Sequence, residues 1–141
     1  MSRIYLVRHG QTAWNSENRL QGHTDLPLND VGRQQAQRVG EFFAAFHMQG
    51  LFTSHLQRSQ QTAQVILAGN GHGLTPVVEQ GLAECNLGAW EGLTPLEIDA
   101  QFEGAYQQWR TQPSRVQIPR AEPLADFRLR VEQQAALRLG G

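Results

Sequence analysis

Arg3-Ile4-Tyr5-Leu6-Val7-Arg8-His9-Gly10 is the stretch of sequence that decides the fold. Its residues 4–7 form an unbroken apolar run of β-forming residues, which is typical of a central strand buried on both faces. The run ends in a guanidinium, an imidazole and a glycine. Because open α/β sheets bind ligands at the carboxyl ends of their strands, the sequence predicts a strand that delivers Arg8, His9 and Gly10 to a ligand site.

These three residues have properties that suit an anionic ligand. Arg8 can hold a phosphate or a carboxylate through two parallel hydrogen bonds. His9 can act as a base, a metal ligand or a nucleophile. Gly10 allows a sharp turn and a close approach of the backbone to a ligand. An isolated Arg-His-Gly tripeptide is more often a structural histidine at a strand end, so the rest of the chain has to decide.

Composition excludes several classes of function. The 141 residues carry a formal net charge of −1, which gives no electrostatic footprint for nucleic acid or a membrane surface. All 12 basic residues are arginines, so a Walker A loop and Schiff-base chemistry, which both need lysine, are excluded. The histidines outside the first strand show no metal-ligand spacing, so we expect neither a metal nor another cofactor.

Targeting signals are also sparse. Cys85 is the single cysteine, which excludes an intrachain disulfide and fits a reducing compartment. The apolar run before Arg8 has four residues and is too short for a signal-peptide core or a membrane span. These features predict a cytoplasmic protein.

The remaining patterns predict a series of alternating strands and helices. In chain order they are a loop over residues 11–28, a helix over 29–47, a strand over 51–54, a helix ending at 69, a tight loop over 69–73, a strand over 75–78, a helix over 94–102, a loop over 111–120, and a last helix that starts at Pro123 and is capped by Gly140 and Gly141. This order predicts a single α/β domain over residues 1–141 with a largely parallel sheet.

Polar residues follow each predicted strand. Arg8 and His9 follow the first, Arg58 follows the second near a helix N-terminus that favours anions, and Glu84 follows the third. Because parallel strands end at the same edge of a sheet, these four side chains are expected to converge. Phosphoryl transfer through a phosphohistidine needs such a set, namely a nucleophile, cations for the phosphoryl oxygens and a proton donor for the leaving group.

Several ordered blocks of sequence point to a family. They are LVRHGQTAWN over residues 6–15, RLQG over 19–22, DLPL over 25–28, SHLQRSQQTA over 54–63, LAE over 82–84 and GAWEG over 88–92. Together they resemble the histidine phosphatase superfamily, in its phosphoglycerate-mutase-like branch. The resemblance covers essentially the whole chain and implies a three-layer α/β/α sandwich whose reaction needs no metal.

The resemblance also implies roles for individual residues. His9 matches the phosphorylated nucleophile, Arg8 and Arg58 match the phosphate-pocket arginines, and Glu84 matches the proton donor that later activates water. Asn15, Gln21 and Gly22 match positions that line phosphate or substrate, and Gly10 and Thr12 complete the expected binding set. The neighbouring loop residues His23, Thr24 and Asp25 are interpreted as ordinary turn residues.

One part of the family pattern is missing from this chain. The family has a second pocket histidine in a Ser-His-Gly-type segment after a later central strand, and the chain stops before it. Glu122-Pro123 stands where the family usually shows Glu-Ser. His72-Gly73 repeats the dipeptide but precedes its strand, so we do not expect it to replace that histidine. We therefore expect the C-terminal part of the domain, with the last central strand, to be missing, whether the chain is a fragment or a truncated form.

Three functions are compatible with the sequence. The first is a phosphatase that hydrolyses a small-molecule phosphomonoester through a phosphohistidine on His9, with phosphoglycerate mutase-type transfer as a close variant. The second is a catalytically impaired remnant that still binds phosphate, and the third is a carbohydrate- or nucleotide-binding module, which no residue favours. We expect the first, with low activity in this chain, and a homodimer is compatible with it.

Overall fold

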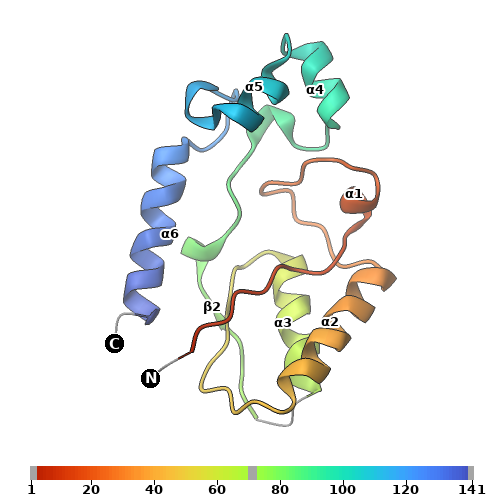
Figure 1. The fold of residues 1–141 in the computed structure, drawn as a ribbon, viewed down its shortest axis with the longest axis vertical. Helices are drawn as coiled ribbons and strands as arrows, with labels where there is room; N and C mark the ends of the chain where they lie inside the picture. Colours follow the sequence, from red (N-terminus) through yellow and green to blue (C-terminus); the bar gives the residue numbers. More distant parts are fainter. Residues whose placement is uncertain (1–2, 70–72, 140–141) are drawn as a thin grey trace.

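The computed structural model describes residues 3–69 and 73–139, and Figure 1 shows how its elements are arranged. The predictions of a tight loop through residues 70–72 and of a cap at Gly140 and Gly141 lie outside the described residues. The helices are α1 (Ala13–Ser16), α2 (Asp30–Phe43), α3 (Gln57–Ala68), α4 (Pro95–Gln101), α5 (Ala105–Thr111) and α6 (Leu124–Leu139). The strands are β1 (Phe52–Thr53) and β2 (Val77–Val78), and the 3-10 helices are η1 (Gln80–Leu82), η2 (Gly88–Trp90) and η3 (Pro113–Arg115).

A parallel βαβ unit forms the middle of the fold. β1 and β2 pair in parallel, with Phe52 opposite Val77 and Thr53 opposite Val78, and α3 connects the two strands along the chain. This pairing confirms the predicted α/β class with a parallel sheet. Both strands are shorter than predicted, because only the residues that share backbone hydrogen bonds count as sheet.

The N-terminal run differs from its prediction. Residues 4–7 form no strand, and their exposed fractions are 55% for Ile4, 45% for Tyr5, 93% for Leu6 and 44% for Val7. A strand exists only through hydrogen bonds to a neighbour, and within residues 3–69 and 73–139 no segment pairs with this run. Tyr5 still packs against Phe43, with ring centroids 5.2 Å apart. The prediction of a strand buried on both faces was therefore wrong for this structure.

Helices α2 and α3 pack against each other in one layer beside the N-terminal segment (Figure 1). The sequence offers Asn29 or Asp30 as the cap of α2, and the structure shows Asn29 in that role, because its side-chain oxygen accepts a hydrogen bond of 2.8 Å from Gly32 N. The helix ends at Phe43, earlier than predicted, and its buried face consists of Gly32, Ala36, Gly40 and Phe43. A side chain at Gly40 would lie 3.1 Å from the carbonyl oxygen of Ile66, so glycine allows the two helices to approach closely.

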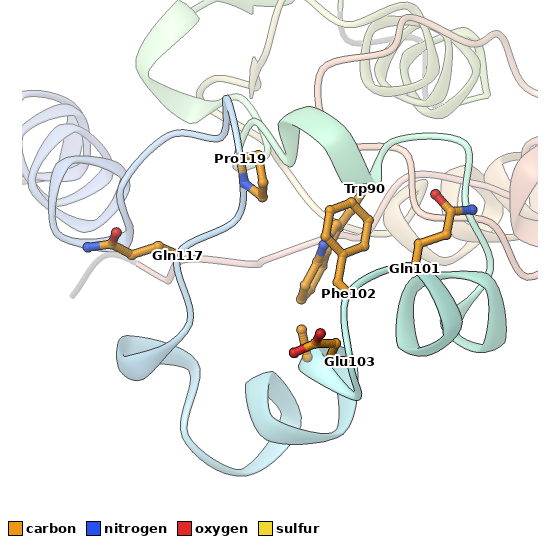
Figure 2. A pocket seen from close by; sticks show the side chains of 7 residues that line it. Trp90, Gln101, Phe102, Glu103, Gln117 and Pro119 are labelled. Carbon is orange, nitrogen blue, oxygen red and sulfur yellow. The ribbon is translucent and has the colours of Figure 1, made fainter.

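The far end of the molecule holds α4, α5 and an aromatic cluster. Thr94 and Glu97 form the capping box that starts α4. The short helix α5 was not predicted, although its Tyr106 and Trp109 pack on the buried Trp90 with centroids 6.2 and 6.0 Å away. A hollow of about 290 Å³ lies here. Figure 2 shows Trp90 and Phe102 on one side of it and Gln117 and Pro119 on the other. None of the described residues that line it is cationic, so it does not suit a phosphate.

Helix α6 stands apart from the α2–α3 layer (Figure 1). Its predicted apolar stripe, formed by Leu124, Phe127, Val131 and Ala135, is half-buried along its whole length. Phe127 and Val131 face a hollow that also touches Val7 and Leu82. The stripe therefore lines a cavity and is not packed against a continuous sheet.

Gly32 offers a test of this packing. Alanine is normally favoured over glycine inside a helix by about 1 kcal/mol. Here a methyl group at Gly32 would overlap the carbonyl oxygen of Gln11 and lie 2.7 Å from its nitrogen. We expect Gly32→Ala to lower the free energy of unfolding by about 1–3 kcal/mol, measured by thermal or urea denaturation.

Gly50→Ala is the matched control, because its added carbon would meet only the Phe52 ring, at 3.6 Å. We expect that variant to unfold as the wild type does. An equal or higher stability of Gly32→Ala would show that the contact between the N-terminal loop and α2 is loose.

Candidate active site

A hollow of about 270 Å³ brings together the four residues that the sequence predicted as catalytic. Arg8, His9, Arg58 and Glu84 all line it. They come from the end of the N-terminal run, from the first turn of α3 and from the segment after η1. The remaining wall is mostly apolar and consists of Val7, Leu56, Ser59, Leu82, Ala83, Phe127 and Val131.

His9 is held in one defined tautomer. Its Nδ1 lies 2.7 Å from the carbonyl oxygen of Gly10. A carbonyl only accepts hydrogen bonds, so Nδ1 carries the proton and Nε2 keeps its lone pair. Burial lowers the pKa of His9, and the positive charges of Arg58 and Arg8 lower it further, against the effect of the Gly10 carbonyl. The imidazole is therefore neutral near pH 7 and has a free nucleophilic nitrogen.

Both backbone groups of Gly10 are used inside the protein. Its carbonyl accepts from His9, and its N–H donates to Thr62 Oγ1 at 3.0 Å. Thr62 Oγ1 in turn donates to the carbonyl oxygen of Arg58 at 2.7 Å. Gly10 thus links the position of His9 to α3.

Arg58 is a buried cation with one nitrogen, Nε, that has no partner among the described residues. It is 1% exposed, and its Nη1 and Nη2 donate to the carbonyl oxygens of Thr24 at 3.0 Å and Gly22 at 2.7 Å. Among the described residues its buried Nε has no hydrogen-bond partner. Burial lowers the pKa of Arg58, but the group stays charged at neutral pH because the ordinary pKa of an arginine lies far above neutrality. An oxyanion is the partner that such an open, charged donor requires.

The Glu91 carboxylate fixes the loop at residues 22–24, whose carbonyl oxygens bind Arg58. Its Oε1 accepts from the backbone nitrogens of His23 at 2.8 Å and Leu87 at 3.1 Å. Its Oε2 accepts from the backbone nitrogen of Thr24 at 2.9 Å and from the Thr24 hydroxyl at 2.5 Å. Gly22, with φ of +54°, turns the loop in the left-handed region that favours glycine. Sequence reasoning assigned no role to Glu91, although it lies in one of the blocks that carry the family resemblance.

The polar residues predicted to bind phosphate on the long loop mostly bind one another. The hydroxyl of the fully buried Thr12 donates to Gln21 Oε1 at 2.7 Å. The side-chain oxygen of Asn15 accepts from Thr12 N at 3.0 Å, which completes the capping box of α1. Thr12, Asn15 and Gln21 are not among the described residues that line the hollow. Gly22 contributes through its carbonyl, which accepts from Arg58.

Asp25 occupies the N-terminus of α3. Its Oδ1 accepts from Gln57 N at 2.7 Å, so the protein itself supplies a carboxylate to one of the free helix amides. The sequence predicts only an ordinary turn residue at Asp25. The helix terminus therefore contributes less to ligand binding than its position suggested, and the guanidinium of Arg58 remains the main cation of the hollow.

Glu84 is exposed and is fixed through its backbone. Its Oε1 accepts from the nitrogen of Cys85 at 2.7 Å, and its carbonyl oxygen accepts from His23 Nε2 at 2.7 Å. The carbonyl also accepts from Arg130 Nη2 at 2.9 Å. His23 was interpreted as a turn residue and Arg130 was not singled out, because neither contact leaves a signal in the local sequence. Burial, together with the charges of Glu122 and Glu84, raises the pKa of the neighbouring Cys85 thiol to about 11.

Arg8 differs from Arg58 in its surroundings. It is exposed and makes no hydrogen bond or ion pair with the residues that the structure describes, yet it lines the same hollow. Residues 3–69 and 73–139 contain no group of three or more His, Cys, Asp or Glu side chains that could hold a metal. In the same ranges no helix combines the length and apolarity needed to cross a membrane.

The structure combines a parallel α/β unit with a hollow lined by one histidine, two arginines and one carboxylate. The chain belongs to the histidine phosphatase superfamily (branch 1), which matches residues 4–137. This match confirms the family and the fold class that the sequence predicted.

Known proteins similar to this chain carry the names of two kinds of enzyme. It is 40% identical over 117 residues to phosphoglycerate mutase-like protein 4 of Arabidopsis thaliana, covering 82% of this chain and 50% of that protein. It is 38% identical over 108 residues to glucosyl-3-phosphoglycerate phosphatase of Mycolicibacterium vanbaalenii, covering 77% of this chain and 47% of that protein.

A solved structure supports the fold. A mycobacterial glucosyl-3-phosphoglycerate phosphatase in complex with VO3 superposes with a TM-score of 0.83 at 32% identity, over 94% of this chain and 65% of that one. The chain thus spans about half to two thirds of the length of these relatives.

The electrostatics of His9 give a direct prediction. Its pKa should lie below the ordinary 6.5, and Arg58→Met should raise it, because the imidazolium then loses a repelling charge. Arg8→Met should raise it less, since the charge of Arg8 contributes less than that of Arg58. The measurement is an NMR titration of the His9 imidazole.

The same shift has a consequence for stability. The unfolded chain binds a proton at His9 more readily than the folded chain, so the contribution of His9 to the free energy of unfolding is lost as the pH falls below about 6.5.

In the NMR titration, an unchanged His9 pKa in Arg58→Met would show that the two groups do not interact.

Proposed function

We propose that this chain belongs to a phosphatase that hydrolyses a small phosphate ester through a phosphohistidine on His9. One observation supports this proposal above the others. A neutral imidazole with a free Nε2 and a buried guanidinium with a free Nε line the same hollow. The first can attack a phosphorus atom, and the second can hold the oxygens of that phosphoryl group.

The proposed reaction has two steps. In the first, Nε2 of His9 forms a bond to phosphorus, the ester P–O bond breaks, and Glu84 gives its proton to the leaving oxygen. In the second, Glu84 takes a proton from water, the water oxygen attacks phosphorus, and the P–N bond breaks to release phosphate and His9. Arg8 and Arg58 hold the phosphoryl oxygens in both steps, and no metal or other cofactor is needed.

The names of the relatives support the proposed class of substrate. Their names include a phosphoglycerate mutase-like protein and a glucosyl-3-phosphoglycerate phosphatase, so phosphorylated derivatives of glycerate are the first esters to test. In a mutase, a second phosphorylated molecule would receive the phosphoryl group in place of water. Phosphoglycerate mutase-type transfer is therefore the close alternative to hydrolysis.

A second function, phosphate binding without turnover, is favoured by the exposed N-terminal run. His9 follows residues 4–7, which have no strand partner among the described residues, and Leu6 is 93% exposed. A nucleophile on an unpaired segment is held less rigidly than one at the end of a buried strand. We propose that the single domain is completed by residues that pair with this run, and that without them the chain binds phosphate better than it turns over esters.

Labelling tests the nucleophile. We expect an ester with a radioactive phosphoryl group to leave an acid-labile, base-stable label on the protein, and His9→Ala to remove it. The control is His47→Ala, on the loop after α2 and away from the hollow. The readout is the bound label after denaturation at high and low pH.

The outcomes of that experiment separate the proposals. A label that persists in His9→Ala would refute the assigned nucleophile. No label in the wild type, combined with a higher melting temperature in vanadate, would replace the phosphatase proposal by binding alone. Neither a label nor a thermal shift would contradict both functions.

Glu84→Gln tests the proton donor. The amide keeps the shape of the side chain but cannot give and take the proton, so we expect turnover to fall by about 10²–10⁴-fold. Vanadate should still raise the melting temperature, because the cations of the hollow are unchanged. Turnover at the wild-type rate with saturating substrate would remove Glu84 from the mechanism.

A further inference from the structure

We propose that Arg130, on α6, is the positioning residue that fixes Glu84 for proton transfer. This inference rests on the proposed function, since it takes Glu84 as the proton donor. Arg130 donates from Nη1 to the carbonyl oxygens of Gly81 at 3.0 Å and Ala83 at 2.8 Å. Its Nη2 donates to the carbonyl oxygen of Glu84 at 2.9 Å. One guanidinium thus holds three carbonyls of a four-residue stretch that ends at Glu84.

Glu122 fixes the guanidinium itself. Its Oε1 lies 2.6 Å from Arg130 Nε, and its Oε2 lies 2.8 Å from Arg130 Nη2, which is the two-point geometry that a planar fork and a carboxylate form. The hydrogen bonds from Arg130 lower the pKa of Glu122. Both side chains are largely buried, with exposed fractions of 24% and 17%, so the pair is better shielded than a surface ion pair.

All five N–H groups of Arg130 are used in this network, two toward Glu122 and three toward the backbone. A lysine has three donors on a single nitrogen and cannot reproduce the arrangement. The network therefore depends on the guanidinium group and not on positive charge alone.

Two further hydrogen bonds join Glu122 to Asn86, just beyond Glu84 along the chain. Glu122 N donates to the carbonyl oxygen of Asn86 at 2.9 Å, and Asn86 N donates to Glu122 Oε2 at 3.4 Å. On the other side, His23 Nε2 donates to the carbonyl oxygen of Glu84. The stretch that carries Glu84 is thus held between α6 and the loop that also holds Arg58.

These hydrogen bonds to the backbone matter because few other contacts position Glu84. Its side chain is exposed, and the hydrogen bond that it receives comes from the adjacent Cys85 nitrogen. A proton donor has to lie within about 2.6–3.2 Å of the leaving oxygen, and a misplacement of about 1 Å can cost about 10²-fold in rate. Fixing the backbone at Glu84 is therefore the means by which α6 controls the reaction.

Arg128 provides the matched control. It lies on the same helix two residues earlier, its side chain is 79% exposed, and it pairs with Glu132 one turn away. Arg128→Met removes an arginine and an ion pair from α6 without touching the Glu84 stretch. We expect it to behave as the wild type in every measurement below.

The experiment compares two esters that differ in how much they need a proton donor. An aryl phosphate with an acidic phenol leaves with little protonation, whereas an alkyl phosphate requires it. We expect Arg130→Met and Arg130→Lys to lose about 10²-fold on the alkyl ester and much less on the aryl ester. Glu122→Gln should show the same selectivity with a smaller loss, because it keeps the guanidinium.

Amide hydrogen exchange gives a second readout that needs no turnover. The nitrogens of Asn86 and Glu122 should exchange faster in Arg130→Met than in Arg128→Met, because they donate to Glu122 Oε2 and to the Asn86 carbonyl oxygen within the network. Equal losses on the two esters, or unchanged exchange at these amides, would overturn the inference. If Glu84→Gln itself shows no preference between the esters, the proton-donor role in the proposed function fails, while the exchange data still decide whether Arg130 fixes the stretch.

Discussion

The burial of one guanidinium sets the main constraint on this structure. Removing a cation from water costs several kcal/mol unless its donors are satisfied. Arg58 meets that cost with the carbonyls of Gly22 and Thr24, so the long loop has to turn back on α3, and the Glu91 carboxylate has to hold the loop in place. Arg58 and His9 line the same hollow, and the charge of Arg58 opposes protonation of His9. The path of the long loop and the protonation of His9 therefore both depend on the charge of Arg58.

Much of the fold could be predicted from sequence because it depends on local signals. Asn29 is a strong N-cap, Gly40 of α2 permits close packing on α3, and the short apolar runs around β1 and β2 bracket a helix. The failure at residues 4–7 has a different origin. Composition reports how much surface a segment can bury, but burial also requires neighbouring strands, and the described residues supply none. The short helix α5 was missed because its aromatic side chains indicate packing without specifying a helix.

The residues of the site also differ in how well the sequence could predict them. Arg8, His9, Arg58 and Glu84 line one hollow, as the predicted order of strands and helices led us to expect, although the structure has no strand before Arg8. Thr12, Asn15 and Gln21 show what the sequence does not carry, since a polar side chain looks the same whether its partner is a ligand or the protein. Glu91, His23 and Arg130 act on residues 46 to 68 positions away, so no local pattern could reveal them.

Cys85 lies next to the proposed proton donor, and its buried thiol bears on how oxidants act there. Peroxides and disulfides react with the thiolate, and a buried thiol whose pKa is about 11 holds a negligible thiolate fraction at neutral pH. The chain has no other cysteine with which Cys85 could form an internal bridge. Cys85 therefore offers oxidants little thiolate beside Glu84 at neutral pH.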